Sequence, residues 1–248
     1  MLRTWLDKLQ KKRKGDPDKA HCAAVIVAAG SSRRMGQDKL LLPLGGVPLL
    51  ICTLRVFQSC PLVDEIVLVT REDRLQETAD LCKEYGMEKI SRIVIGGKTR
   101  TESVLAGVSE VCPETALIAI HDAARPLLSE ALIKATVRAA AVHLAAAPAL
   151  KGVDTLKAVD GEGFILGTVD RETTLRIQTP QVFQAELIKG ALTSAVEKGL
   201  SLTDDCAAVE RMGVKTATVP GEEDNIKITT PRDLLLAEAI WNERSAKT

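Results

Sequence analysis

The chain has 248 residues, 46% of them hydrophobic, and its 33 basic and 33 acidic side chains leave no net charge. This length suits one large α/β domain or two small ones, and the charge balance argues against nucleic acid or an anionic membrane as the main partner, because those surfaces select a basic excess. No run of about 18 apolar residues occurs, so no membrane span is predicted, and six cysteines without a C-x-x-C pair are expected to be reduced thiols in a cytoplasmic protein.

Residues 1–20 are expected to be an extension that precedes the domain. Leu2, Trp5, Leu6 and Leu9 recur at helical spacing, which is typical of a short amphipathic helix, and a basic run follows at residues 11–14. The segment has no apolar h-region and no small-residue cleavage site, so it is not a secretory signal. We expect a frayed extension, with an amphipathic helix as the alternative, before a domain over residues 21–248.

From residue 21 to residue 143, apolar runs alternate with helical patterns. Strands are predicted at 23–28, 65–70, 89–95 and 116–121, and helices at 48–59, 74–85, 101–111 and 129–143. Ser129 is a candidate N-cap of the last helix. Strands that are apolar along their whole length and separated by helices predict a mostly parallel, Rossmann-like α/β sheet with helices on both faces. Ligands of such sheets bind beyond the carboxyl ends of the strands.

The pattern changes over residues 151–176, where short alternating pieces are interrupted by the turn signal Asp-Gly-Glu-Gly at 160–163. This predicts a β-arm that projects from the sheet and needs something to pack on. After it, helices are predicted at 184–198, at 204–212 and from 231, with a strand near 215–219. The interpretation is one domain with an arm.

The end of the first predicted strand is the strongest functional signal. Ala28, Ala29 and Gly30 have almost no side chains, so a flat ligand can lie against the backbone there. Arg34 and Lys39 follow in a basic loop, where a polyphosphate needs positive charge. The glycine spacing excludes a P-loop and a dinucleotide fingerprint, so the sequence predicts a nucleotide site of another kind.

Two further motifs follow strands. Asp122, in the motif His-Asp-Ala-Ala-Arg-Pro at 121–126, is placed to bind Mg²⁺ on a nucleotide, although a structural cap bonded to Arg125 explains it equally well. Residues 96–103 contain two glycines that permit close backbone approach, with Ser103 as a donor in the first turn of a helix. A plain turn with a capping box explains that segment as well. Elsewhere, Arg171 and Lys227 are of the types that grip phosphate.

Taken together, these segments make the chain resemble the 2-C-methyl-D-erythritol 4-phosphate cytidylyltransferase family. The resemblance covers roughly residues 22 to 244 and follows one order along the chain. Its segments are 28–39 (AAGSSRRMGQDK), 96–104 (GGKTRTESV), 121–126 (HDAARP), 168–172 (TVDRE), 179–183 (TPQVF), 202–205 (LTDD) and 224–229 (DNIKIT).

The resemblance implies a nucleotidyltransferase fold whose β-arm exchanges between the subunits of a homodimer. It implies Mg²⁺-assisted attack by the phosphate of methylerythritol phosphate, a sugar-alcohol phosphate, on the α-phosphorus of CTP, with pyrophosphate as leaving group, in isoprenoid precursor synthesis. Because the incoming phosphate is already a nucleophile, this reaction depends on alignment and placed charge and needs no activated side chain.

The resemblance also implies roles for individual residues. The implied catalytic residues are Arg34, Lys39, Arg171 and Lys227. The implied nucleotide contacts are Ala28, Ala29, Gly30, Gly97, Ser103, Asp122, Ala123 and Arg125, with Asp122 as the metal ligand. The implied contacts of the acceptor are Thr155, Arg171, Thr179, Thr203 and Lys227.

One residue departs from the family pattern, and two alternative functions fit parts of the sequence. Many relatives have an acidic residue after Gly97, near the ribose, where this chain has Lys98. A ribitol-5-phosphate cytidylyltransferase would share the nucleotide site and differ only in the acceptor pocket. A non-catalytic nucleotide-binding dimer module is disfavoured because a decayed enzyme is expected to lose charge from its phosphate sites.

Overall fold

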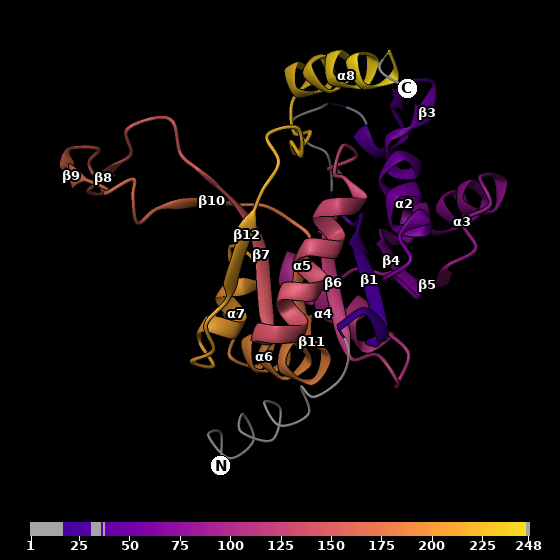
Figure 1. Ribbon diagram of the computed structural model, residues 1–248, viewed down its shortest axis with the longest axis horizontal. Coiled ribbons are helices and arrows are strands. Elements are labelled where there is room, and N and C mark those ends of the chain that lie inside the picture. The colour runs from indigo at the N-terminus through magenta and orange to yellow at the C-terminus, as the bar shows by residue number, and fades with distance from the viewer. Residues whose placement is uncertain (1–16, 31–35, 37, 247–248) are drawn as a thin grey trace.

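Four parallel strands form the centre of the sheet in the computed structural model, which describes residues 17–30, 36 and 38–246 (Figure 1). They are β1 (Cys22–Val27), β4 (Glu65–Thr70), β5 (Ile90–Ile95) and β6 (Leu117–Asp122), in the order β6-β1-β4-β5. Every residue of β4 and β6 is buried. Each strand begins and ends within about one residue of its predicted position, so the expectation of a parallel, doubly covered sheet is confirmed.

Helices cover both faces of this sheet. Alternate residues of β1 contribute to two separate cores: Ala24 and Ile26 face one layer, and Ala23 and Val25 face the other. The first layer draws on α2 and α5, and the second on α4 and α6. The helices are α2 (Leu49–Ser59), α3 (Leu75–Glu84), α4 (Arg100–Ser109), α5 (Glu130–His143), α6 (Ala185–Glu197), α7 (Cys206–Glu210) and α8 (Pro231–Ser245). The predicted N-cap is confirmed, since the Ser129 side chain accepts a hydrogen bond from the Leu132 N–H.

The other half of the sheet contains antiparallel strands that the sequence analysis did not predict. They are β7 (Ala145–Lys151), β10 (Leu175–Ile177) and β11 (Gln181–Gln184). Strand β12 (Ala217–Pro220) confirms the strand predicted near 215–219, and it runs parallel to β7. Strand β11 lies between β6 and β7 and is antiparallel to both. It therefore brings residues after the arm beside the end of β6.

The loop after β1 leads into short elements that carry Lys39. These are the 3₁₀ helix η3 (Lys39–Leu41) and the two-stranded hairpin of β2 (Pro43–Leu44) and β3 (Val47–Pro48). The Asp38 side chain caps η3 by accepting from the Leu40 N–H at 3.1 Å. Gly45, in the turn of this hairpin, has a φ of +59° and leaves no room for a Cβ because Trp241 of α8 lies against it. The last helix is thereby held to the segment that follows Lys39.

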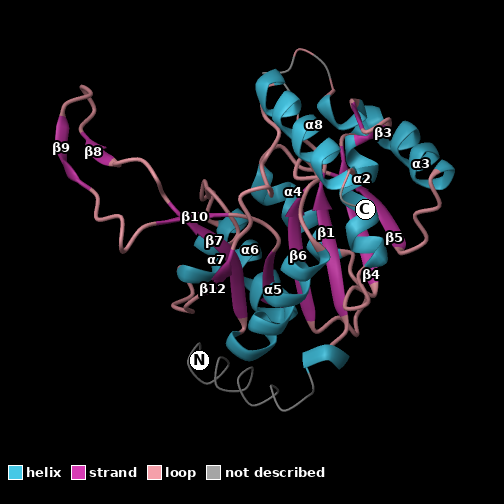
Figure 2. Ribbon diagram, turned by 45° about the horizontal axis from the view of Figure 1, so that its top comes forward, coloured by secondary structure: helices cyan, strands magenta, loops and turns pink. Residues whose placement is uncertain are grey.

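A long projection leaves the sheet between β7 and β10 (Figures 1 and 2). At its end β8 (Lys157–Val159) and β9 (Ile165–Thr168) pair antiparallel. The expected turn lies between them, where Asp160 Oδ1 accepts from the N–H groups of Glu162 and Phe164 at 3.0 and 2.9 Å. We call the projecting segment, residues 152–174, the arm.

Two sequence expectations concern the described chain as a whole. In the part of the chain that the structure describes, no helix has the length and apolar character needed to cross a membrane. All six cysteines are free thiols, and five of them are buried. Of the expected N-terminal extension, residues 1–16 lie outside the described residues, and Pro17–Lys19 forms the short 3₁₀ helix η1.

Candidate nucleotide-binding site

A cleft of about 430 Å³ lies where β1 and β6 end. The loop before α4, the helix η3 and the segment before α8 complete its walls. Its lining consists of residues 27–30, 39–40, 97–100, 103, 122, 124 and 227. This is the edge at which ligands of parallel α/β sheets bind. Lys39, Asp122 and Lys227, which the sequence analysis selected from three distant segments, meet there.

Small residues form one wall of the cleft. The Ala28 N–H donates to the Val69 carbonyl at 2.7 Å, which fixes the chain just after β1. At Gly96 an added Cβ would lie 2.6 Å from Ala29 Cβ and 2.8 Å from Ser103 Oγ. Only glycine therefore permits the loop before α4 to approach the end of β1 this closely. The result is a nearly flat backbone surface suited to a planar ligand.

The N-terminus of α4 also lines the cleft. Both interpretations of residues 96–103, a capping box and a close backbone approach to a ligand, are compatible with its structure. Thr99 and Glu102 form a complete capping box. Ser103 is 3% exposed, and its hydroxyl donates to the Thr99 carbonyl at 2.8 Å. The segment is thus a capped helix start and also a wall of the cleft. Its backbone N–H groups and helix dipole favour an anion or an electron-rich ring atom.

Asp122 is the only carboxylate among the described residues that line the cleft, and three cations surround it. Its Oδ2 lies 2.9 Å from Lys227 Nζ and 3.5 Å from Arg125 Nε, and its Oδ1 lies 3.8 Å from Arg100 Nη2. Burial alone would raise the pKa of Asp122, but Lys227 and Arg100 outweigh burial and hold it well below its usual range. The side chain is therefore an ionised acceptor at neutral pH.

Arg100 and Asp205 form a buried pair that the sequence analysis did not predict. Arg100 Nη1 and Nη2 donate to the two carboxylate oxygens of Asp205 at 2.8 and 2.7 Å, and Asp205 is 1% exposed. Burial alone would lower the pKa of Arg100, but Asp205 and Asp122 raise it. Both residues lie in segments that carry the resemblance, but nothing in the sequence pairs positions 105 residues apart.

Lys39 links η3 to the segment that carries Lys227. Its Nζ donates to the Ile228 carbonyl at 2.7 Å, one residue after Lys227. Arg34, expected to act with Lys39, lies outside the described residues. Lys98 also lines the cleft, and its backbone N–H donates to Glu102 Oε2 at 2.6 Å while its side chain is exposed.

Three residues that were expected to contact a substrate, Ala123, Arg125 and Thr179, lie behind the residues that line the cleft. Ala123 is 1% exposed, and Arg125 donates through Nη1 to the Asn225 carbonyl at 2.7 Å. Thr179 is 4% exposed and its hydroxyl contacts His121 Nδ1 at 2.9 Å. Burial of the His121 ring lowers its pKa to about 4, so it is neutral near pH 7.

The remaining expected acceptor contacts are not brought to the cleft within one chain. Thr155 and Arg171 belong to the arm, where Arg171 lines a small depression with Asp154 and Leu156. Thr203 is exposed on the loop before α7. None of the three lines the cleft.

The side chains that could ligate a metal determine which kind of metal site the cleft can form. Among the described residues no three His, Cys, Asp or Glu side chains converge as a metal site. Mg²⁺ is commonly held by one or two carboxylates together with phosphate oxygens and water. A single ionised carboxylate, Asp122, fits a metal that arrives with a polyphosphate ligand and does not fit a resident metal held by protein alone.

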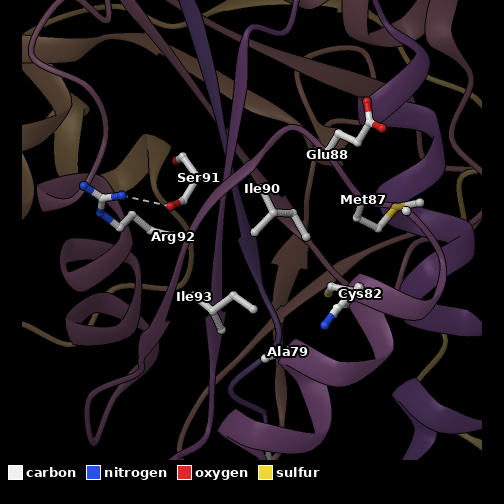
Figure 3. Close-up of a pocket in the computed structure, with 10 residues that line it drawn as sticks. Ala79, Cys82, Met87, Glu88, Ile90, Ser91, Arg92 and Ile93 are labelled. Carbon is white, nitrogen blue, oxygen red and sulfur yellow. Dashed lines mark hydrogen bonds between the residues drawn. The ribbon is translucent and has the colours of Figure 1, made fainter.

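A second depression, of about 390 Å³, lies between α3 and the edge strand β5 (Figure 3). Ala79, Cys82, Ile90 and Ile93 supply apolar side chains to it. Burial raises the pKa of the Cys82 thiol to about 11, so Cys82 is no nucleophile. Lys83, Glu88 and Arg92 also line this depression, but it contains none of the site residues that were predicted from the sequence.

The chain is similar to known proteins over nearly its whole length. Residues 22–243 match the family model described as 2-C-methyl-D-erythritol 4-phosphate cytidylyltransferase. A protein of that name from Dehalococcoides mccartyi (strain 195) is 43% identical over 218 residues, which cover 88% of this chain and 94% of the relative. One from Symbiobacterium thermophilum is 42% identical over 225 residues, with 90% and 94% covered.

Solved structures agree with the sequence relatives. The crystal structure of 4-diphosphocytidyl-2C-methyl-D-erythritol synthase from Anaerococcus prevotii superposes with a TM-score of 0.81 at 32% identity, covering 91% of this chain and 97% of the other. That of 2-C-methyl-D-erythritol 4-phosphate cytidylyltransferase from Thermus thermophilus gives a TM-score of 0.74 at 32% identity, covering 90% and 99%.

Proposed function

Because this chain belongs to the 2-C-methyl-D-erythritol 4-phosphate cytidylyltransferase family, we propose that its cleft transfers CMP from CTP to 2-C-methyl-D-erythritol 4-phosphate. An oxygen of the acceptor phosphate forms a bond to the α-phosphorus of CTP. The bond from that phosphorus to the bridging oxygen breaks, and pyrophosphate leaves. The product is 4-diphosphocytidyl-2-C-methyl-D-erythritol, a precursor of isoprenoids.

The observation that carries this proposal is the meeting of Lys39, Asp122 and Lys227 in one cleft beside the capped start of α4. Phosphoryl transfer needs alignment and charge more than covalent help from the protein. The cleft supplies charge of both signs and a flat wall. The described residues of its lining include no activated nucleophile, and the reaction requires none because the acceptor brings its own.

We place the nucleoside of CTP against the wall of small residues. Their backbone groups and the Ser103 hydroxyl lie within reach of a base that occupies this wall, and the ribose then lies toward Asp122. The proposed nucleotide contacts are Ala28, Ala29, Gly30, Gly97, Ser103 and Asp122, with Ala123 and Arg125 supporting Asp122 from behind.

Lys39, with Arg34 from the loop beside it, is proposed to stabilise charge on the five-coordinate phosphorus. The Ile228 carbonyl at 2.7 Å fixes the position of the Lys39 ammonium in the cleft. Charge that is positioned in advance stabilises a transition state without a cost of reorganisation at the moment of reaction.

Asp122 is proposed to bind Mg²⁺ that enters with CTP. Such an ion polarises phosphate oxygens and helps to orient the leaving group. The carboxylate and the Lys227 ammonium form an ion pair at 2.9 Å. When the acceptor phosphate binds, Lys227 contacts that phosphate, and Asp122 becomes available to the metal.

The acceptor site is proposed to be completed by a second copy of the chain. Arg171 and Thr155 lie on an arm that projects away from its own sheet (Figure 2), so they reach a cleft only in another subunit. Large apolar side chains on the arm are exposed: Val153 by 83%, Phe164 by 67%, Ile165 by 65% and Leu166 by 69%. Such a patch is expected to be buried in a homodimer.

An end-point assay tests the proposal. CTP, UTP, ATP and GTP are each offered with methylerythritol phosphate or ribitol 5-phosphate, and ³¹P NMR detects pyrophosphate and the new diphosphate. We expect product from CTP and methylerythritol phosphate with added Mg²⁺. Product with ribitol phosphate alone would overturn the proposed acceptor, and equal use of UTP would overturn the role given to the wall of small residues.

A further inference from the structure

The buried ring of His121 fixes a hydrogen-bond direction behind the cleft. Its Nε2 lies 3.2 Å from the Arg125 carbonyl oxygen, and its Nδ1 lies 2.9 Å from Thr179 Oγ1. The ring is fully buried, and its hydrogen-bond partners are a carbonyl and a hydroxyl, neither of which carries a charge, so it is neutral. A carbonyl oxygen only accepts, so Nε2 carries the single proton. Nδ1 is then an acceptor, and the Thr179 hydroxyl donates its hydrogen to it.

The same hydroxyl oxygen accepts a hydrogen bond from the Asp122 N–H at 3.2 Å. The register of β6 against β11 explains why the Asp122 N–H needs a side-chain acceptor. Strands β6 and β11 pair from Leu117 to Ile120, and the pairing stops at Gln181. Beyond that point the Asp122 N–H has no main-chain acceptor on β11. The Thr179 side chain takes the place of the absent carbonyl, and it is 4% exposed.

Thr179 also contacts the segment that carries Lys227. Its carbonyl oxygen accepts from Asn225 Nδ2 at 2.9 Å, and Asn225 is fully buried two residues before Lys227. One residue therefore bonds to the backbone of Asp122 on one side and to the Lys227 segment on the other.

We propose that Thr179 is a positioning residue that sets Asp122 and Lys227 at their separation, with its hydroxyl oriented by His121, and that it makes no contact with the acceptor phosphate. Its only hydrogen is donated to His121, and the residue does not line the cleft. A buried donor already committed to a ring nitrogen has none left for a phosphate oxygen. The role in turnover depends on the function proposed above, whereas the hydrogen-bond arrangement does not.

Kinetics of Thr179→Val and Thr179→Ser separate the two roles. Valine keeps the shape and removes the hydroxyl. We expect Thr179→Val to raise the KM for Mg–CTP or lower kcat by about fivefold, the effect of one lost hydrogen bond, with the KM for the acceptor within about twofold. Thr179→Ser, which keeps the hydroxyl, should have the kcat and the KM for Mg–CTP of the wild type. Because valine keeps the Thr179 carbonyl that accepts from Asn225, the Lys227 segment is not disturbed, so a rise confined to the acceptor KM would show a direct phosphate contact and overturn the proposal.

NMR of ¹⁵N-histidine-labelled wild-type protein tests the arrangement without turnover. The chain has three histidines, so the buried ring can be assigned by a His121→Asn variant. We expect a pyridine-type Nδ1 and a pyrrole-type Nε2 for His121, and Thr179→Val should move the Nδ1 signal. A protonated Nδ1 in the wild type would overturn the proposal. If the wild type transferred no cytidylyl group, the proposed function would fail, and this spectrum would still decide the hydrogen-bond direction.

Discussion

Lys39 is the residue whose loss should reduce turnover without damaging the fold. It lines the cleft, and its ammonium is held by the Ile228 carbonyl at 2.7 Å. We expect Lys39→Ala to lower kcat by about a hundredfold or more, the scale seen when one donor that stabilises developing charge is removed. Lys198→Ala, on the exposed end of α6, is the control and should keep full activity. Unchanged turnover in Lys39→Ala would remove Lys39 from the mechanism, provided that thermal unfolding shows both variants folded.

Single site residues were predictable where they follow strands. Asp122 stands at the end of one apolar run, and Lys39 lies in the basic loop that follows another. Because the carboxyl ends of parallel strands meet at one edge, the convergence of these two segments follows from local sequence and fold class. The pair of Arg100 and Asp205 was not predictable in this way. It depends on how α4 packs against the loop before α7, and no local pattern reports such a contact.

At the scale of elements, two helix glycines should respond to alanine with opposite signs. On Gly107 of α4 a Cβ would lie 2.6 Å from both Val25 Cγ1 and Val69 Cγ2, so the helix would have to move off the sheet. We expect Gly107→Ala to destabilise the protein by about 1–3 kcal/mol. Gly190 of α6 has nothing within 4 Å, and Gly190→Ala should stabilise by up to about 1 kcal/mol through helix propensity. Denaturant unfolding measures the change in the free energy of unfolding for both variants. Changes of equal sign would contradict this packing of α4.

The start of α8 should make stability depend on pH. Asp233 Oδ2 accepts from Thr229 N, Thr229 Oγ1 and Thr230 N at 2.8, 2.7 and 2.8 Å. Burial alone would raise the pKa of Asp233, but these hydrogen bonds lower it. A carboxyl whose pKa is lower in the folded state stabilises fully above its unfolded pKa of about 4, and this contribution is lost as pH falls through the folded value.

Thermal unfolding of Asp233→Asn checks this dependence. The melting temperature of the variant should lie below that of the wild type near pH 7, and the difference should become smaller as the pH falls toward about 3. Thr230→Ala, which removes the neutral half of the capping box, is the matched comparison. It should cost about 1 kcal/mol at both pH values. A gap for Asp233→Asn that stayed constant with pH would contradict the role given to the carboxylate.

The elements that sequence reasoning missed share a physical cause. Strand β7 has the sequence Ala-Ala-Ala-Pro-Ala-Leu-Lys, with no β-branched residue and no alternation, and β11 has only four residues. Both form because neighbouring strands and two helical layers bury them, so tertiary contacts override weak local preference. The four parallel strands were predictable because their apolar runs are long and their separations suit helices.

At the scale of the whole molecule, the proposed exchange of arms between two subunits predicts how a substitution on the arm changes the oligomeric state. Its apolar residues are exposed, and its Arg171 and Thr155 are absent from the cleft of their own chain. Phe164→Asp should therefore place a charge in the contact between subunits and shift the protein toward monomer. Light scattering after gel filtration measures the change, and Lys198→Ala again serves as the control. A wild type that is already monomeric at assay concentration would contradict the exchange of arms.

Mixing two inactive variants decides whether Arg171 acts across subunits. Suppose Lys39→Ala and Arg171→Ala are each nearly inactive as homodimers. In a mixed dimer, if Arg171 reaches the partner's cleft, one cleft combines both defects, and the other combines an intact Lys39 with an intact Arg171. Random exchange makes half of the dimers mixed, each with one good site of two, so about a quarter of wild-type activity should return. If Arg171 serves its own chain, each cleft of a mixed dimer carries one defect and nothing returns. Activity measured before and after subunit exchange, with each variant treated alone as the control, separates the two arrangements.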